Sequence, residues 1–243
     1  MTLEAIKEPF DHDAEPAATA QREAYRHIRR RILSGAFGPG HRINLAEVAD
    51  TLAISRMPVR EALRQLDAEG MVLMRPNRGA TVVDLTPLEV EEYFQIRAVL
   101  EGLAAGLAAE RLTQEDIEQL TLLKQQMCRA VDDRPMWIER HRRFHELISG
   151  ICGRPNLPRE IARITDLLTP RTAAHLALSG IEKLPGHEHD SVLDALCSGD
   201  AAIAEVEMRR HILAASRDVI AHMHDRKQGP AKTARRSDTA AHR

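Results

Sequence analysis

The hydrophobic and polar positions before Asp84 predict a helix-turn-helix. Residues 44–52 carry apolar side chains at helical spacing, and residues 55–66 do the same after a gap of only two or three positions. Two helices joined this closely must cross at a steep angle, as they do in a helix-turn-helix. A further helix is predicted upstream, over residues 20–34.

Two short apolar segments follow and predict a β-hairpin. They cover residues 71–74 and 80–83, and a basic turn with glycine at its end, residues 75–79, separates them. A helix-turn-helix followed by a basic-tipped hairpin is a winged helix.

After Asp84 the periodicity is helical throughout. Thr86 and Glu89 form a predicted capping box, with Pro87 at the first helical position, and open a helix through Glu110. Further helices are predicted over residues 113–131, 135–151, 157–178, 187–198 and 201–223. Because no alternating strand pattern appears after Val83, the fold class is mainly α. An N-terminal winged helix-turn-helix precedes a C-terminal all-α antiparallel bundle of about six helices.

Charge divides the chain in the same way. We expect a disordered tail over 1–18, the winged helix-turn-helix domain over 19–84, a helical domain over 85–224, and a disordered basic tail over 225–243. Residues 19–84 carry 11 Lys or Arg against 7 Asp or Glu, a net charge of +4, whereas residues 85–224 sum to −6. A basic domain beside an acidic one fits a nucleic-acid reader joined to a second function.

Other classes of protein lack support in the sequence. No apolar run reaches the length of a membrane span, and no secretory signal is visible, so we expect a cytoplasmic protein without membrane contact. The three cysteines form no CxxC unit, which favours free thiols. There is no Walker loop, Gly-x-Gly-x-x-Gly or Gly-x-Ser-x-Gly motif, so nucleotide binding and serine hydrolysis are not predicted.

The helix after the predicted turn carries an arginine stripe. Arg56, Arg60 and Arg64 are four residues apart and share a face, opposite the apolar positions of the same helix. Ser55 is the predicted N-cap, and Pro58 stands where a missing N–H has no cost. Such a helix suits insertion into the major groove of DNA. The alternative is a surface helix with ordinary solvated arginines.

The run Ser55 to Leu63, with Leu66, Gly70 and Gly79, resembles the DNA-binding domain of GntR-type bacterial transcription regulators. The resemblance covers roughly residues 20–84. It implies that Arg56 and Arg60 contact phosphates or guanine edges and that Arg78 and Gly79 approach the minor groove. The expected DNA-binding residues are Arg30, Ser55, Arg56, Met57, Pro58, Arg60, Arg64, Asn77, Arg78 and Gly79.

Histidines are the candidate metal ligands in the predicted bundle. His141 and His145 are four residues apart and project from one helix face, while His189 and His211 lie on later helices. Imidazole suits zinc, nickel, copper or iron, and a pair at this spacing presents two nitrogens to one ion. The alternative is that each histidine is solvated or bonded to a backbone carbonyl. His187 is two residues from His189 and should face another way.

The segment Arg142 to Ile148, followed by Glu188-His189 and Met208 to His211, resembles the FCD ligand-binding domain of the FadR subgroup of GntR regulators. This resemblance covers roughly residues 89–223. Metal-binding members use Asp-x-x-x-His on one helix with two later histidines. His145, His189 and His211 match the histidine positions, whereas His141 stands where that pattern has Asp. The implied cofactor is a divalent transition metal, with zinc or nickel favoured by the nitrogen ligands.

Arg97 and Arg171 are candidates for binding an effector, since a guanidinium pairs with a carboxylate through two hydrogen bonds. The alternative is a helix-surface role. The sequence thus predicts a homodimeric repressor, with no catalytic residues, that reads a palindromic operator in double-stranded DNA. A small organic acid, bound over a metal ion, would control its affinity. A dedicated metal sensor and, much further from the pattern, a metalloenzyme are the alternatives.

Overall fold

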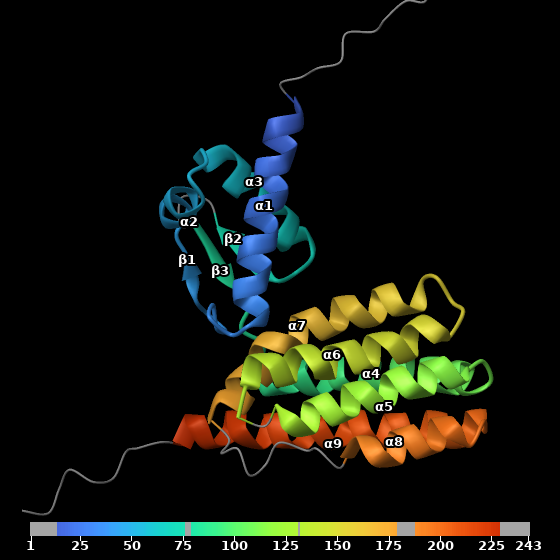
Figure 1. Cartoon of the computed structure of the whole chain (residues 1–243). Helices are drawn as coiled ribbons and strands as arrows, with labels where there is room; N and C mark the ends of the chain where they lie inside the picture. Colours follow the sequence, from blue (N-terminus) through green and yellow to red (C-terminus); the bar gives the residue numbers. More distant parts are fainter. Residues whose placement is uncertain (1–13, 76–78, 131, 179–187, 229–243) are drawn as a thin grey trace, which may run out of the picture. The chain divides into compact units, whose positions relative to one another are not determined.

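The computed structural model describes residues 14–75, 79–130, 132–178 and 188–228. Contacts divide the chain into two compact units, traced in Figure 1. The first contains the described residues up to Asp84 together with Ala162–Ala174, and the second contains Leu85–Ile161 and the described residues from His175 onward.

The first unit is a winged helix-turn-helix. Its elements are α1 (Ala14–Leu33), β1 (Arg42–Ile43), α2 (Leu45–Leu52), α3 (Arg56–Ala68), β2 (Val72–Arg75) and β3 (Gly79–Val82). The strands form an antiparallel sheet in the order β1-β3-β2. The predicted helices and hairpin are present. Strand β1 was not predicted, because two residues are too few to give a period.

The turn between α2 and α3 is fixed by local geometry. The side chain of Asn44 accepts a hydrogen bond from the backbone N–H of Ala46 at 2.9 Å and caps the start of α2. Ala53 ends that helix in the left-handed region, at φ 52°. Beyond the turn, α3 buries the apolar positions predicted for it, namely Val59, Ala62, Leu63 and Leu66.

Two helix ends differ from the prediction. Helix α1 begins at Ala14, within the segment predicted to be disordered, and α9 (Ala201–Gln228) runs beyond its predicted end at Met223. Residues 14–20 are rich in alanine, which favours helix without producing an amphipathic pattern. Because the prediction relied on periodicity, it placed the start of this helix too late, at residue 20.

In the second unit the described elements are helices. They are α4 (Pro87–Ala109), α5 (Gln114–Arg129), α6 (Arg134–Ile151), α7 (Leu157–Leu178), α8 (Glu188–Cys197) and α9, and α7 is shared with the first unit. The capping box predicted at Thr86 and Glu89 is formed, and a second one joins Thr113 to Asp116. The predicted fold class is confirmed.

Helices α4 and α9 pack closely because glycines on α4 leave room for the facing helix. A Cβ atom at Gly106 would lie 2.9 Å from the carbonyl oxygen of Ala201, and one at Gly102 would lie 2.6 Å from Cγ of Arg209. Helices α6 and α8 pack on this pair, and together these four helices hold the histidine site described below. Among the described residues, no helix is long and apolar enough to cross a membrane.

Candidate functional site

The arginine stripe of α3 lies on the surface of the first unit. Arg56, Arg60 and Arg64 are exposed, and the face opposite to them is buried in the core. Arg64 pairs with Glu61 at 2.7 Å on the same helix, whereas the structure gives Arg56 and Arg60 no such partner among the described residues. The two residues nearer the start of the helix therefore offer their guanidinium groups to a ligand without breaking an ion pair.

The start of α3 is also open to a ligand. Ser55 occupies the N-cap position, but within the described chain its side chain makes no capping hydrogen bond. Pro58, at the third helical position, has no N–H to give to such a cap. Ser55 is thus the N-cap residue as predicted, and its exposed hydroxyl is available to a phosphate oxygen. Met57 is 59% exposed beside it.

The wing is described up to its tip. Arg75 on β2 pairs with Gly79 on β3, and Gly79 has a φ of 79°, which favours glycine. Asn77 and Arg78, predicted to contact DNA, lie outside the described residues. Arg30 is exposed in the last turn of α1, on a different helix from the stripe.

The second unit brings together the four predicted histidines. His141 and His145 come from α6, His189 from α8 and His211 from α9, and one nitrogen of each lies within 4.8 Å of the others. The ring centroids of His189 and His211 are 4.5 Å apart, and those of His141 and His145 are 4.6 Å apart. His145, His189 and His211 are buried, and His141 is partly buried, stacked on the indole of Trp137. We call this group the histidine cluster.

A buried carboxylate supports the cluster from α4. Oε2 of Glu101 lies 2.6 Å from Nδ1 of His145, and its other oxygen pairs with Arg97 one turn earlier. A carboxylate that accepts a hydrogen bond from one imidazole nitrogen leaves the other nitrogen free to bind a metal. Glu101 thus fixes the tautomer of His145 in which Nε2 faces the cluster with a lone pair.

The electrostatics keep two of the imidazoles neutral. Burial and the neighbouring histidines hold the pKa of His141 and that of His211 well below the usual value of 6.5. Burial alone would raise the pKa of Glu101, but the charge of Arg97 and the contact with His145 lower it to about 2. Glu101 is therefore ionised while His141 and His211 are neutral, as metal binding requires.

The buried nitrogen atoms fit a metal ion. Nε2 of His145 and Nδ1 of His211 are buried, and neither has a hydrogen-bond partner among the described residues. A buried polar atom left without a partner is costly, and an ion at the centre of the histidine cluster would satisfy both atoms. The donor set contains only imidazole, which suits zinc or nickel better than magnesium or calcium.

The structure changes the predictions for the two arginines. Arg97 is buried beside the histidine cluster, but its guanidinium is engaged by Glu101 and so is not a free clamp for a carboxylate. Arg171 forms an ion pair with Asp84 and belongs to the first compact unit, not to the unit that holds the histidines. Glu101 is the residue that sequence reasoning missed. Its spacing of four from Arg97, on a helix made mostly of apolar residues, was the available signal.

Family models match both units. Residues 20–82 match the model for bacterial regulatory proteins of the gntR family, and residues 92–214 match the model for the FCD domain. The two matches correspond to the winged helix-turn-helix and to the helical bundle.

Individual proteins agree with these matches. The chain is 28% identical over 201 residues to the HTH-type transcriptional repressor GlaR of Escherichia coli K12, covering 79% of this chain and 91% of that protein. It is 30% identical to the uncharacterised HTH-type transcriptional regulator YdhC of Bacillus subtilis, covering 59% of this chain and 66% of YdhC. That match spans just under two thirds of YdhC. The solved structure of E. coli McbR/YncC superposes with a TM-score of 0.74 at 24% identity, covering 86% of this chain and 98% of that one. The chain is thus a transcriptional regulator that belongs to the gntR family and carries a C-terminal FCD domain.

Proposed function

We propose that this regulator is a cytoplasmic homodimeric repressor whose affinity for a palindromic operator is set by a metal ion and a small organic acid in the histidine cluster. The observation that carries the proposal is the convergence of four imidazoles from three helices, one of them oriented by a buried carboxylate. Nothing in a purely structural role requires four imidazoles to gather in this way.

The first part of the proposal assigns DNA reading to α3. Arg60 is exposed opposite the buried Val59, Leu63 and Leu66. A guanidinium that contacts a base through two hydrogen bonds contributes roughly 1–3 kcal/mol to the free energy of binding, and this is lost when the arginine is removed. Arg60→Ala should therefore weaken binding to a duplex selected from a random DNA pool and leave the melting temperature unchanged. The matched control is Arg22→Ala, which removes an exposed arginine from α1. Equal affinities of the two variants at matched salt would refute the assignment.

The second part assigns metal binding to the histidine cluster. His145, His189 and His211 would hold the ion, with His141 as a fourth ligand. The ion would link α6, α8 and α9 and stabilise the fold by linkage, because binding is confined to the folded state. A bound ion also supplies a positive charge that attracts the carboxylate of an organic acid. Binding of the acid changes DNA affinity only if it favours one state of the regulator over the other.

The metal test compares two histidine variants of the full chain. His189→Ala should lose the transition metal found by elemental analysis and the rise in melting temperature on adding zinc or nickel. His224→Ala changes an exposed histidine of α9 and should keep both. Purified protein that contains no transition metal and shows no thermal shift with either ion would contradict the proposal. The histidines would then line a metal-free pocket for an anion.

A second candidate is a dedicated metal sensor, and the number of imidazoles favours it. Four ligands fill a tetrahedral zinc ion and leave no position for an acid, whereas a site that takes a carboxylate needs an open position. Titrating metal alone and following DNA affinity separates the two candidates. A full response to metal alone supports the sensor, and a response that requires an added acid such as citrate supports the effector-controlled repressor.

The homodimer is proposed from α4. Ile96, Val99 and Leu103 lie at helical spacing on this helix and are 47%, 50% and 44% exposed. Beside them is a hollow of about 480 Å³ lined by leucines of α4 and by Leu157 of α7. A second copy of the chain is the occupant that suits this face, since a palindromic site requires two-fold symmetry.

A further inference from the structure

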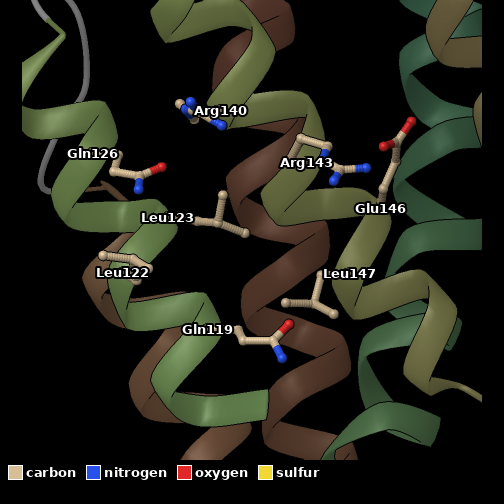
Figure 2. Close-up of a pocket in the computed structure, with 8 residues that line it drawn as sticks. All are labelled: Gln119, Leu122, Leu123, Gln126, Arg140, Arg143, Glu146 and Leu147. Atoms are coloured by element: carbon tan, nitrogen blue, oxygen red, sulfur yellow. The ribbon is translucent and has the colours of Figure 1, made fainter. Parts of the chain in front are cut away.

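A groove on the second unit lies between α5 and α6, and its lining contains none of the histidines of the cluster. It has a volume of about 440 Å³, within the range of small-molecule sites. Figure 2 shows its lining, with residues of α5 along one ribbon and residues of α6 along the next. The lining residues are Gln119, Leu122, Leu123, Gln126, Arg140, Arg143, Glu146 and Leu147.

Two arginines of α6 line this groove and have no anionic partner among the described residues; in Figure 2 Arg140 extends toward α5 and Arg143 toward Glu146. Arg142, between them in sequence, pairs with Glu139 and Glu146, but no ion pair engages Arg140 or Arg143 in the described chain. Nε of Arg140 is also buried and makes no hydrogen bond there. A buried donor that is left unsatisfied destabilises the site, and an anionic oxygen would satisfy it.

The rest of the lining is amphipathic. Leu122, Leu123 and Leu147 supply apolar surface, and Leu122 is 52% exposed. Gln119 and Gln126 supply amide groups at the two ends of the α5 side. Glu146 is the acidic residue of the lining, its carboxylate is held by Arg142, and in Figure 2 it points away from α5, as the guanidinium of Arg143 does. The groove therefore offers positive charge at one end and hydrocarbon surface beside it.

We propose that this groove binds a small organic carboxylate with a short apolar body, at a site distinct from the histidine cluster. The carboxylate would receive hydrogen bonds from the guanidinium group of Arg140 and, once its exposed side chain turns toward α5, from that of Arg143, because a guanidinium favours such an oxygen pair. The apolar body would lie on Leu122, Leu123 and Leu147. Because α6 also carries His141 and His145, a ligand here contacts the helix that supplies half of the histidine cluster.

The test measures binding of hexanoate to the full chain by isothermal titration calorimetry, with acetate and inorganic phosphate as comparison probes. We expect saturable hexanoate binding in the millimolar range or tighter. Hexanoate should bind more tightly than acetate, by about fourfold for each of its methylene groups that is buried against the leucines. Arg140→Gln and Arg143→Gln should each weaken hexanoate binding by about tenfold or more. Arg217→Gln, an exposed position on α9 outside the lining, is the matched control and should leave binding unchanged.

Each remaining outcome has a defined meaning. Hexanoate affinity that survives chelation of metal and the His189→Ala substitution supports a separate site, and loss of binding in either case assigns the ligand to the histidine cluster instead. Phosphate binding as tight as hexanoate binding would overturn the apolar part of the proposal. Equal affinities in the Arg140→Gln, Arg143→Gln and Arg217→Gln proteins, all with unchanged melting temperature, would overturn the site itself.

Discussion

At the scale of single residues, the histidine cluster is supported by a buried carboxylate from α4. Glu101 is 2% exposed, and both of its oxygens are engaged, one by His145 and the other by Arg97. Burying an ionised carboxylate is costly unless it is paired and hydrogen-bonded, and here both conditions hold. Its position indicates that it orients His145 instead of taking part in binding directly.

Glu101→Gln tests this positioning role. The amide keeps the size of the side chain but removes the charge that sets the tautomer of His145, so metal affinity should fall by about tenfold to a hundredfold. Competition against a coloured zinc chelator measures this affinity. Glu139→Gln, at a half-exposed ion pair of α6, is the control and should retain the affinity of the parent protein. A lower melting temperature with unchanged metal affinity would make Glu101 a structural residue only.

The stability of the metal-free protein should depend on pH through the same residues. The folded-state pKa values of His141 and His211 lie well below 6.5, so below that pH the unfolded chain binds more protons than the folded one. The free energy of unfolding should therefore fall as the pH drops from 6.5 toward 5. Glu101, with a pKa of about 2, stays ionised in the folded state over this range and adds a further loss only below about pH 4.5. Urea unfolding at several pH values checks the slope, and His141→Gln/His211→Gln should flatten it.

At the scale of elements, the helices that carry an apolar stripe or a capping motif were predicted from the sequence. Features that form only through contact with another strand or side chain were not. The buried and exposed faces of helix α3 were both predicted, because its apolar residues and its arginines each recur at helical spacing on opposite sides. Strand β1 has only two residues and exists because β3 pairs with it. Ser55 is the N-cap residue as predicted, but its side chain makes no capping hydrogen bond, since Pro58 has no N–H to give. The ion pair of Arg97 with Glu101, four residues later on the same helix, was not predicted.

The contact between α4 and α9 gives a prediction with a built-in control. Gly106→Ala places a methyl group 2.9 Å from the carbonyl oxygen of Ala201, so the helices must separate, and we expect a loss of about 1–3 kcal/mol of stability. Gly150→Ala is also on a helix, but a Cβ atom there meets nothing within 4 Å. It should stabilise the protein by up to about 1 kcal/mol, because alanine favours helix over glycine. Chemical denaturation of both variants measures the difference, and equal stabilities would show that the helices yield without cost.

At the scale of the whole molecule, the division into a DNA-binding unit and a helical unit followed from the change of period at Asp84, and both family matches respect it. The unit to which α7 belongs was not predicted. Its residues 162–174 group with the first unit, although the sequence placed this helix in the C-terminal bundle. Periodicity identifies a helix but carries no information about which neighbours cover it.

The last prediction concerns the assembly. A lysine in place of Val99 would be buried without a partner if a second copy covers this face of α4, so Val99→Lys should convert the dimer to a monomer at micromolar concentration. Met136→Lys alters a residue of α6 that is 46% exposed and should remain dimeric. Sedimentation velocity measures both. The Val99→Lys monomer should retain its fold, but it should bind a palindromic duplex only as tightly as a half-site, because the two contacts are no longer linked. A Val99→Lys protein that stays dimeric would place the interface on another face, and a parent protein that is monomeric with and without DNA would contradict the dimer altogether.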